Sequence, residues 1–86
     1  MIFVTLVRFR GRMTKEYIER TNKIIAGEPK IKVLGFYWTL GRYDAVLVTE
    51  GPDEKTVMKM LLEAGSYVGT ETMVAIPREE AVKLLK

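Results

Sequence analysis

The amino-acid sequence predicts an α+β protein whose elements follow the order β-α-β-β-α-β, with a short helix near the C-terminal end. Four runs rich in β-branched and aromatic residues are separated by breaks that contain glycine or proline, as expected for strands. Two amphipathic segments with capping residues lie between these runs and predict helices. The two halves also repeat, since the segment that begins at Thr14 lies 39 residues before a similar segment that begins at Asp53.

The first half of the chain predicts one strand and one helix. Residues 2–9 form the strand, because β-branched and aromatic side chains dominate this run. Thr14 is placed to cap the helix, with Glu16 in its first turn, where a carboxylate interacts favourably with the helix dipole. Gly27 and Pro29 mark the end of this helix.

Two strands follow directly after each other. Residues 31–40 predict a long strand, and Gly35 within it indicates a bulge or a close approach of the backbone. Gly41 and Arg42 then form a two-residue hairpin turn, since a leading glycine suits a type II′ turn. The third strand is expected over residues 43–50.

The remaining residues predict a second helix, a fourth strand and a short terminal helix. Asp53 or Pro52 is placed near the N-cap of a second helix, and Gly65 follows the expected end of that helix. Residues 70–76 predict the fourth strand, and residues 78–85 predict a short terminal helix. This order is that of the ferredoxin-like plan, an antiparallel sheet with two helices packed on one face.

Both faces of the predicted sheet are largely apolar, because side chains alternate between the two faces of a strand. In the first strand, Ile2, Val4 and Leu6 oppose Phe3, Val7 and Phe9. In the second, Val33 and Tyr37 oppose Leu34, Phe36, Trp38 and Leu40, and in the third, Ala45 and Leu47 oppose Val46 and Val48. Two helices cover only one face, and the terminal helix is too short to cover a four-stranded sheet. An apolar patch of this size is unusual on a monomer. We therefore expect a homodimer or a larger homo-oligomer, assembled through the open face of the sheet.

Length and composition define the class of protein. The 86 residues are enough for one small domain, so we expect a single domain over residues 1–86. Hydrophobic residues make up 48% and charged residues 29%, which is typical of a soluble globular chain. No apolar stretch approaches the roughly 18 residues of a membrane span, and no signal peptide is visible. Scarce Asn and Gln beside abundant Lys and Glu indicate a cytoplasmic protein of a heat-loving microbe.

The absence of His and Cys excludes several kinds of chemistry. Imidazole bases, thiol nucleophiles, and thiolate or imidazole metal ligands are all missing. Asp44 and Asp53 are the only aspartates, so we expect neither a metal nor a cofactor. The net charge of +3 is spread along the chain instead of forming a concentrated basic face, so we expect no nucleic-acid binding.

The segment Gly41-Arg42-Tyr43-Asp44 is the first candidate site. In a functional role, Asp44 is an anchor or base, Tyr43 a hydrogen-bond donor and Arg42 an anion clamp at the mouth of a cleft. In a structural role, the segment forms a hairpin, and Asp44 pairs with Arg42, Arg8 or backbone amides. We favour the structural interpretation.

Three further residues are ligand-binding candidates, each with a structural alternative. Trp38 would line a pocket between two sheets, or belong to the core or the dimer interface. Arg8, the first of three arginines at alternate positions, would bind a phosphate or carboxylate, or form a solvated strand end. Thr5 would present a hydroxyl to a pocket, or act as a good strand residue.

Several motifs resemble the GYD domain family, named for a glycine-tyrosine-aspartate signature. They are the VTLVRF run of the first strand, GFYWTL at 35–40, LGRYD at 40–44, AVLV at 45–48 followed by GPDE, and TETM followed by PREE. The resemblance covers nearly the whole chain. It implies membership of the dimeric α/β-barrel superfamily, in which two ferredoxin-like sheets pack face to face. That superfamily includes monooxygenases, decarboxylases, chlorite-processing enzymes and effector-binding regulator domains, whereas GYD members carry no function that the resemblance implies.

Three functions remain open on the sequence. The first is an oligomeric module that binds a small molecule or serves assembly, which fits the lack of a catalytic constellation. The second is a cofactor-free enzyme, monooxygenase- or isomerase-like, acting on a small aromatic or carbonyl substrate through Asp44, Tyr43 or Arg42; it rests on fold resemblance. The third is a regulatory domain that acts through a partner protein.

Overall fold

The computed structural model describes residues 1–85. Its elements come in the expected order and confirm the α+β prediction. They are β1 (Ile2–Phe9), α1 (Lys15–Ala26), β2 (Lys32–Trp38), β3 (Ala45–Glu50), α2 (Glu54–Leu62), the 3-10 helix η1 (Gly65–Tyr67), β4 (Val68–Ala75) and α3 (Arg78–Val82).

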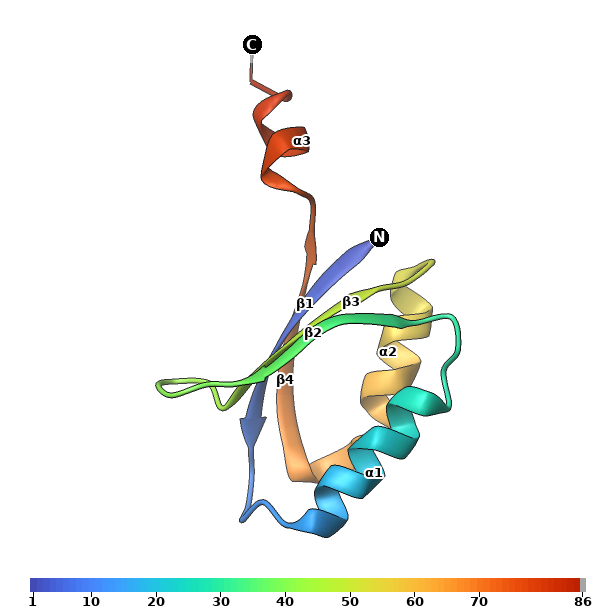
Figure 1. Cartoon of the computed structure of the whole chain (residues 1–86), viewed down its shortest axis with the longest axis vertical. Coiled ribbons are helices and arrows are strands. Elements are labelled where there is room, and N and C mark those ends of the chain that lie inside the picture. Colours follow the sequence, from blue (N-terminus) through green and yellow to red (C-terminus); the bar gives the residue numbers. More distant parts are fainter. Residues whose placement is uncertain (86) are drawn as a thin grey trace.

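The four strands form one sheet in the order β2-β3-β1-β4, and every neighbouring pair is antiparallel. The two longer helices, α1 and α2, lie on the same side of this sheet (Figure 1). Strand order and layering together are those of the ferredoxin-like fold.

Both long helices begin at the cap residues that the sequence predicts. The Thr14 hydroxyl accepts a hydrogen bond from the Tyr17 amide at 3.4 Å. The Asp53 carboxylate accepts one from the Thr56 amide at 2.9 Å and another from the Thr56 hydroxyl at 2.7 Å. Each cap satisfies an amide that has no partner within its helix.

The core lies between the sheet and the two long helices. Its buried cluster consists of Phe3, Ile31, Leu47, Val57 and Met60. Alternate residues of β1 and β3 point into this layer, as the predicted two-residue period requires. Two threonines, Thr5 and Thr49, are buried on the same face of the sheet.

The connection between β2 and β3 differs from the predicted two-residue turn. β2 ends at Trp38 and β3 begins at Ala45, so residues 39–44 form a longer loop. The Thr39 amide donates to the Asp44 carbonyl at 2.8 Å, and the Thr39 hydroxyl donates to the Tyr43 carbonyl at 2.7 Å. These bonds close the loop below its tip, where Gly41 adopts a φ of 126° that favours glycine.

The predicted bulge in β2 is confirmed, but its effect on Val33 was predicted wrongly. Val33 is opposite Thr49, whereas Gly35 is opposite Val48, so the register shifts between them. Because Thr49 is buried under the helices, Val33 lies on the helix side of the sheet and not with Tyr37. The residue inserted by the bulge reverses the alternation.

Three boundaries of helices and strands also differ from the prediction. β4 begins at Val68 instead of residue 70, because the strand starts directly after η1. The helix α2 is capped at Glu63, and Gly65 instead opens η1 with a φ of 65°. The terminal helix ends at Val82, short of the predicted residue 85.

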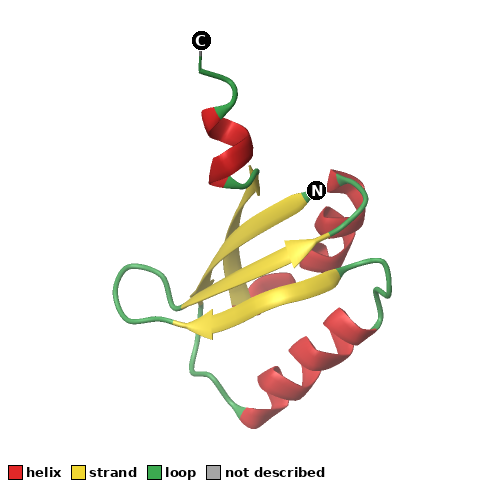
Figure 2. Ribbon diagram, turned by 45° about the horizontal axis from the view of Figure 1, so that its top comes forward, coloured by secondary structure: helices red, strands yellow, loops and turns green. Residues whose placement is uncertain are grey.

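One face of the sheet points away from α1 and α2. We call it the open face, and its apolar members are Ile2, Val4, Leu6, Tyr37, Val46, Val48 and Met73. The helix α3 continues beyond the end of the sheet along the longest dimension of the molecule, so it leaves this face uncovered (Figure 1). Figure 2 shows the loop 39–44 projecting on the side opposite the two long helices. Within residues 1–85, no helix is both long and apolar enough to cross a membrane.

Candidate functional site

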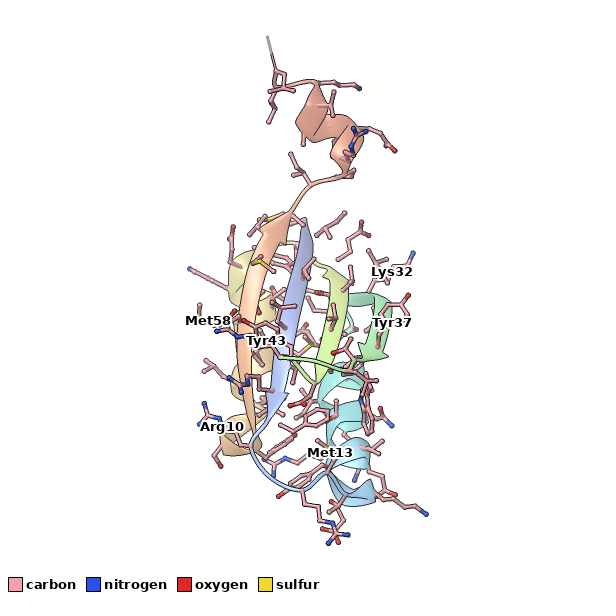
Figure 3. All side chains as sticks on the ribbon, turned by 90° about the vertical axis from the view of Figure 1, so that its left-hand side faces the viewer. Arg10, Met13, Lys32, Tyr37, Tyr43 and Met58 are labelled. Atoms are coloured by element: carbon pink, nitrogen blue, oxygen red, sulfur yellow. The ribbon has the colours of Figure 1, made fainter. Side chains whose placement is uncertain are left out.

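The six predicted site residues do not form one site. Trp38 and Thr5 lie on the helix side of the sheet, opposite Ala45 and Thr72 in neighbouring strands. Arg8 lies on the open face, on the same side as Leu6. Tyr43 also lies in front of the open face (Figure 3). The expected polar cluster at one cleft is therefore split between the two sides of the sheet.

A cavity of about 190 Å³ lies on the helix side, between the sheet and α1. Its lining comes from β1, β2, β3, β4, both long helices and η1. The lining residues are Val7, Phe9, Met13, Ile18, Thr21, Asn22, Ile24, Ile25, Phe36, Trp38, Leu47, Met60, Leu61, Tyr67, Val68 and Thr70. Trp38 is the one predicted site residue in this cavity.

Aromatic rings form two contacts at the cavity. The Phe9 and Trp38 rings meet edge to face, with their centroids 5.4 Å apart and their planes at 68°. Tyr67 stacks on Tyr17 at 4.7 Å, and the Arg20 guanidinium lies 5.1 Å from the centroid of Tyr67. Such pairs hold ring orientations beyond what burial alone provides.

The cavity exists because α1 packs loosely. None of its residues is buried, and Ile18 on the lining is 40% exposed. The Tyr67 hydroxyl is buried and has no hydrogen-bond partner among the described residues. A buried hydroxyl normally has a partner, so this one carries an uncompensated cost of desolvation.

Asp44 has a structural partner at the end of β1. Its carboxylate accepts a 2.7 Å hydrogen bond from the Phe9 amide, and its own amide donates to the Val7 carbonyl at 2.8 Å. The expectation of a backbone partner is correct. Arg8 and Arg42, the alternative candidates, were wrong as partners, because Asp44 continues the pairing of β3 with β1 and thereby turns its carboxylate to the Phe9 amide.

Tyr43 reaches across the open face to β4. Its hydroxyl donates to the Glu71 carboxylate at 2.8 Å, and this bond raises the pKa of Tyr43 above its ordinary value because it favours the protonated hydroxyl. The Arg42 guanidinium lies 5.7 Å from the Tyr43 ring centroid. The charges of Arg42 and Arg8 act on this pKa in the opposite direction. The segment therefore ties the loop to the sheet edge.

Thr5 is paired across the sheet. Its hydroxyl lies 2.9 Å from that of Thr72, and its side chain is only 1% exposed. The hydroxyl is therefore already engaged within the sheet. No group of three or more His, Cys, Asp or Glu side chains close enough to hold a metal ion occurs in residues 1–85.

Most of the cavity lining was missed by the sequence analysis. Met13 and Tyr67 lie in connections, where no periodic pattern assigns a face. Ile18, Ile24 and Ile25 belong to the first of the two amphipathic segments, whose pattern predicted a helix but not a cavity beside it. Tyr17 lies in α1 and Tyr67 at the end of η1, and their stacking depends on the packing of two segments that are remote in sequence.

The comparisons with known proteins agree with this architecture. The model of the GYD domain family matches residues 4–85. The crystal structure of hypothetical protein PHS023 from Pyrococcus horikoshii is similar with a TM-score of 0.57 and 22% identity, over 90% of this chain and 92% of that one. The crystal structure of FFRP-DM1 is similar with a TM-score of 0.55 and 25% identity, over 88% of this chain and 100% of that one.

A third solved structure is less similar. An AsnC family transcriptional regulator from Agrobacterium tumefaciens gives a TM-score of 0.49 and 17% identity, over 92% of this chain and 58% of the regulator. A search of curated proteins found no match.

Proposed function

This chain belongs to the GYD domain family, and from that premise we propose that it is a self-assembling module whose open face binds a second copy of itself. The proposal takes residues 1–86 as one domain. The observation that carries it is the uncovered apolar surface on the side of the sheet away from α1 and α2. A water-exposed sheet face of this kind is typical of a surface that another molecule covers.

The open face has the composition of a protein interface. Its centre is aliphatic, through Val4, Leu6, Val46 and Val48, while Tyr37 and Met73 at its sides are 62% and 48% exposed. Aromatic and methionine side chains are enriched in interfaces, where they bury large areas. Removal of this surface from water would favour pairing.

Charged residues lie at both ends of the apolar centre. Lys32 is opposite Glu50 at one end, and Arg8 and Glu71 lie at the other. Each end therefore carries both signs of charge. In a two-fold pair the same surface meets itself, and ends of mixed sign avoid like-charge repulsion. This pattern favours a second copy of the chain as the partner, and not a strongly charged molecule.

Two apolar projections flank the open face. The loop 39–44 carries the fully exposed Leu40 on the side of this face, and α3 with the residues after it exposes Val82, Leu84 and Leu85. These side chains have little contact with the body of their own chain. In a symmetric pair, each projection would reach the other copy and extend the buried surface.

The decisive experiment compares two substitutions of an apolar residue by aspartate. Val46→Asp places a charge in the centre of the open face, whereas Met58→Asp places one on the exposed side of α2, where Met58 is 60% exposed. Light scattering coupled to gel filtration at micromolar concentration should give a dimer or larger species for wild type and Met58→Asp. Val46→Asp should give the mass of a monomer, and circular dichroism should show that it is folded.

Two results would overturn the proposal. One is a wild-type mass that corresponds to the 9.8 kDa chain alone. The other is a Val46→Asp protein that remains folded and assembles like the wild type. If Val46→Asp does not fold, Tyr37→Asp tests the same face from an exposed position in β2.

Composition supports a cytoplasmic location in a heat-loving microbe for this module. Scarce Asn and Gln beside abundant Lys and Glu favour an organism that grows at high temperature. The purified protein should accordingly melt above about 45–65 °C, the range that is typical of mesophile domains.

A further inference from the structure

The cavity beneath α1 lies on the opposite side of the sheet from the proposed assembly face, so it requires a separate explanation. We infer that this cavity is a binding site for a small, flat, uncharged aromatic molecule. The site is formed by the cavity residues on β1, β2, α1 and η1, which include four aromatic side chains.

Size limits the ligand to about one ring. The cavity measures about 190 Å³. An apolar cavity of about 150 Å³ stays dry and accepts benzene, so this one accommodates a substituted single ring. A larger polycyclic molecule would have to displace α1.

The lining determines the chemistry of the ligand. Phe9, Phe36, Trp38 and Tyr67 contribute aromatic rings, and most of the other lining residues are aliphatic. Among the lining residues, all within the described chain, Tyr67 alone carries a titratable group. A charged ligand would lose its hydration without gaining an ionic partner, so an uncharged one is favoured.

Tyr67 contributes its ring to the cavity and not its hydroxyl. The hydroxyl is buried, so it does not open into the space that a ligand would occupy. Stacking on Tyr17 and the nearby Arg20 guanidinium hold the ring in place. Tyr67 therefore offers the ligand an aromatic contact.

Access to the cavity is available along α1. Ile18 lines the cavity and is 40% exposed, and no residue of α1 is buried. Met13, at the end of the sheet where the chain passes from β1 to α1, lines the same space (Figure 3). A small outward movement of α1 would admit a ligand with little loss of buried contact.

The experiment uses p-cresol and p-xylene, which have nearly the same shape and differ by a hydroxyl in place of a methyl group. Isothermal titration of the wild-type protein should show saturable binding of both, because the lining is apolar and aromatic. In Tyr67→Phe both affinities should be unchanged, because the hydroxyl that is removed does not open into the cavity. The carboxylate p-toluate should not bind.

A filling variant locates the binding. Thr21→Phe places a ring from α1 into the cavity and should abolish binding of p-cresol. The matched variant Glu19→Phe adds the same ring on α1 at an exposed residue outside the lining and should leave the affinity unchanged. Circular dichroism confirms that both variants are folded.

Measurements on the wild-type protein keep the inference falsifiable if Thr21→Phe does not fold. Nuclear Overhauser effects should connect p-cresol protons to the methyl groups of Ile24, Ile25 and Leu61. Contacts confined to the open face, for example to Val4 and Val46, would overturn the inference, as would the lack of saturable binding at millimolar p-cresol. Neither result would alter the test of self-assembly.

Discussion

The carboxylate of Asp44 accepts a 2.7 Å hydrogen bond from the backbone amide of Phe9, which joins the loop before β3 to the last residue of β1. The same Phe9 places its ring against Trp38 at the cavity. A single short contact therefore connects the segment that gives the family signature to the position of an aromatic ring on the helix side of the sheet.

Removal of this carboxylate should destabilise the protein. Asp44→Ala leaves the Phe9 amide without its partner, and the free energy of unfolding should fall by about 1–3 kcal/mol. Asp44→Asn retains an acceptor oxygen, so its free energy of unfolding should fall by less. Chemical denaturation at fixed protein concentration measures both, with Glu19→Gln as a surface control. A neutral or stabilising Asp44→Ala would instead favour a ligand-binding role for this residue.

Two buried threonines should respond differently to the same substitution. Thr49 is fully buried and its hydroxyl has no partner among the described residues, whereas Thr5 is bonded to Thr72. Thr49→Val keeps the shape and removes an unpaired hydroxyl, so stability should rise by about 1 kcal/mol. Thr5→Val loses a hydrogen bond and should be neutral or destabilising. Equal melting shifts in both variants would contradict this explanation.

A methyl group added at Gly51 should clash with a neighbour in the core. The Cβ of an alanine there would lie 2.5 Å from the Cδ1 atom of Ile31, which is only 7% exposed. Gly51→Ala should therefore lower stability by about 1–3 kcal/mol, the usual range for overpacking. Ile31→Val removes Cδ1, so the double variant should lose less free energy of unfolding than the two single variants lose together. Strict additivity would show that this contact is not the cause.

The cap of α2 should make stability depend on pH in the acidic range. Hydrogen bonds from the Thr56 side chain and amide lower the pKa of Asp53 below its ordinary value. The folded state thus favours the ionised form, and this contribution is fully present above the pKa of the unfolded chain. It is lost as the pH falls through the lower folded-state pKa.

Comparison with Asp53→Asn isolates this effect. The melting temperature of the variant should lie below that of wild type at neutral pH, and the gap should close below the folded-state pKa, where wild-type Asp53 is also neutral. Salt should narrow the gap at neutral pH, because Asp53 is exposed. A gap that is constant across the acidic range would rule out the charge as its origin.

Local signals in the sequence were sufficient for the elements and their order. The caps at Thr14 and Asp53 and the bulge at Gly35 depend on neighbouring residues, and all were predicted. The side of the sheet on which Val33 lies was not predicted correctly, because the glycine indicates a bulge without specifying which residue is the extra one. The loop 39–44 is longer than predicted because Thr39 closes it through bonds to the Asp44 and Tyr43 carbonyls, which the Gly41-Arg42 turn signal does not indicate.

The cavity could not have been predicted in the same way. It depends on how far α1 lies from the sheet, and on Trp38 and Tyr67, which belong to different parts of the chain. A periodic pattern identifies which face of a helix is apolar, but not whether that face is fully packed. The aromatic candidate Trp38 was therefore named from the sequence, while its pocket was expected on the other side of the sheet.

Trp38 is the only tryptophan of the chain, and it lies on the cavity lining. Its fluorescence can be excited at wavelengths where tyrosine and simple phenols hardly absorb, so the protein contains one optical reporter at a single known position. Its emission maximum shifts with the polarity around the indole ring and its intensity with quenching by a neighbour. The unmodified chain can therefore be followed in a cuvette, without a label, as the surroundings of that one ring change.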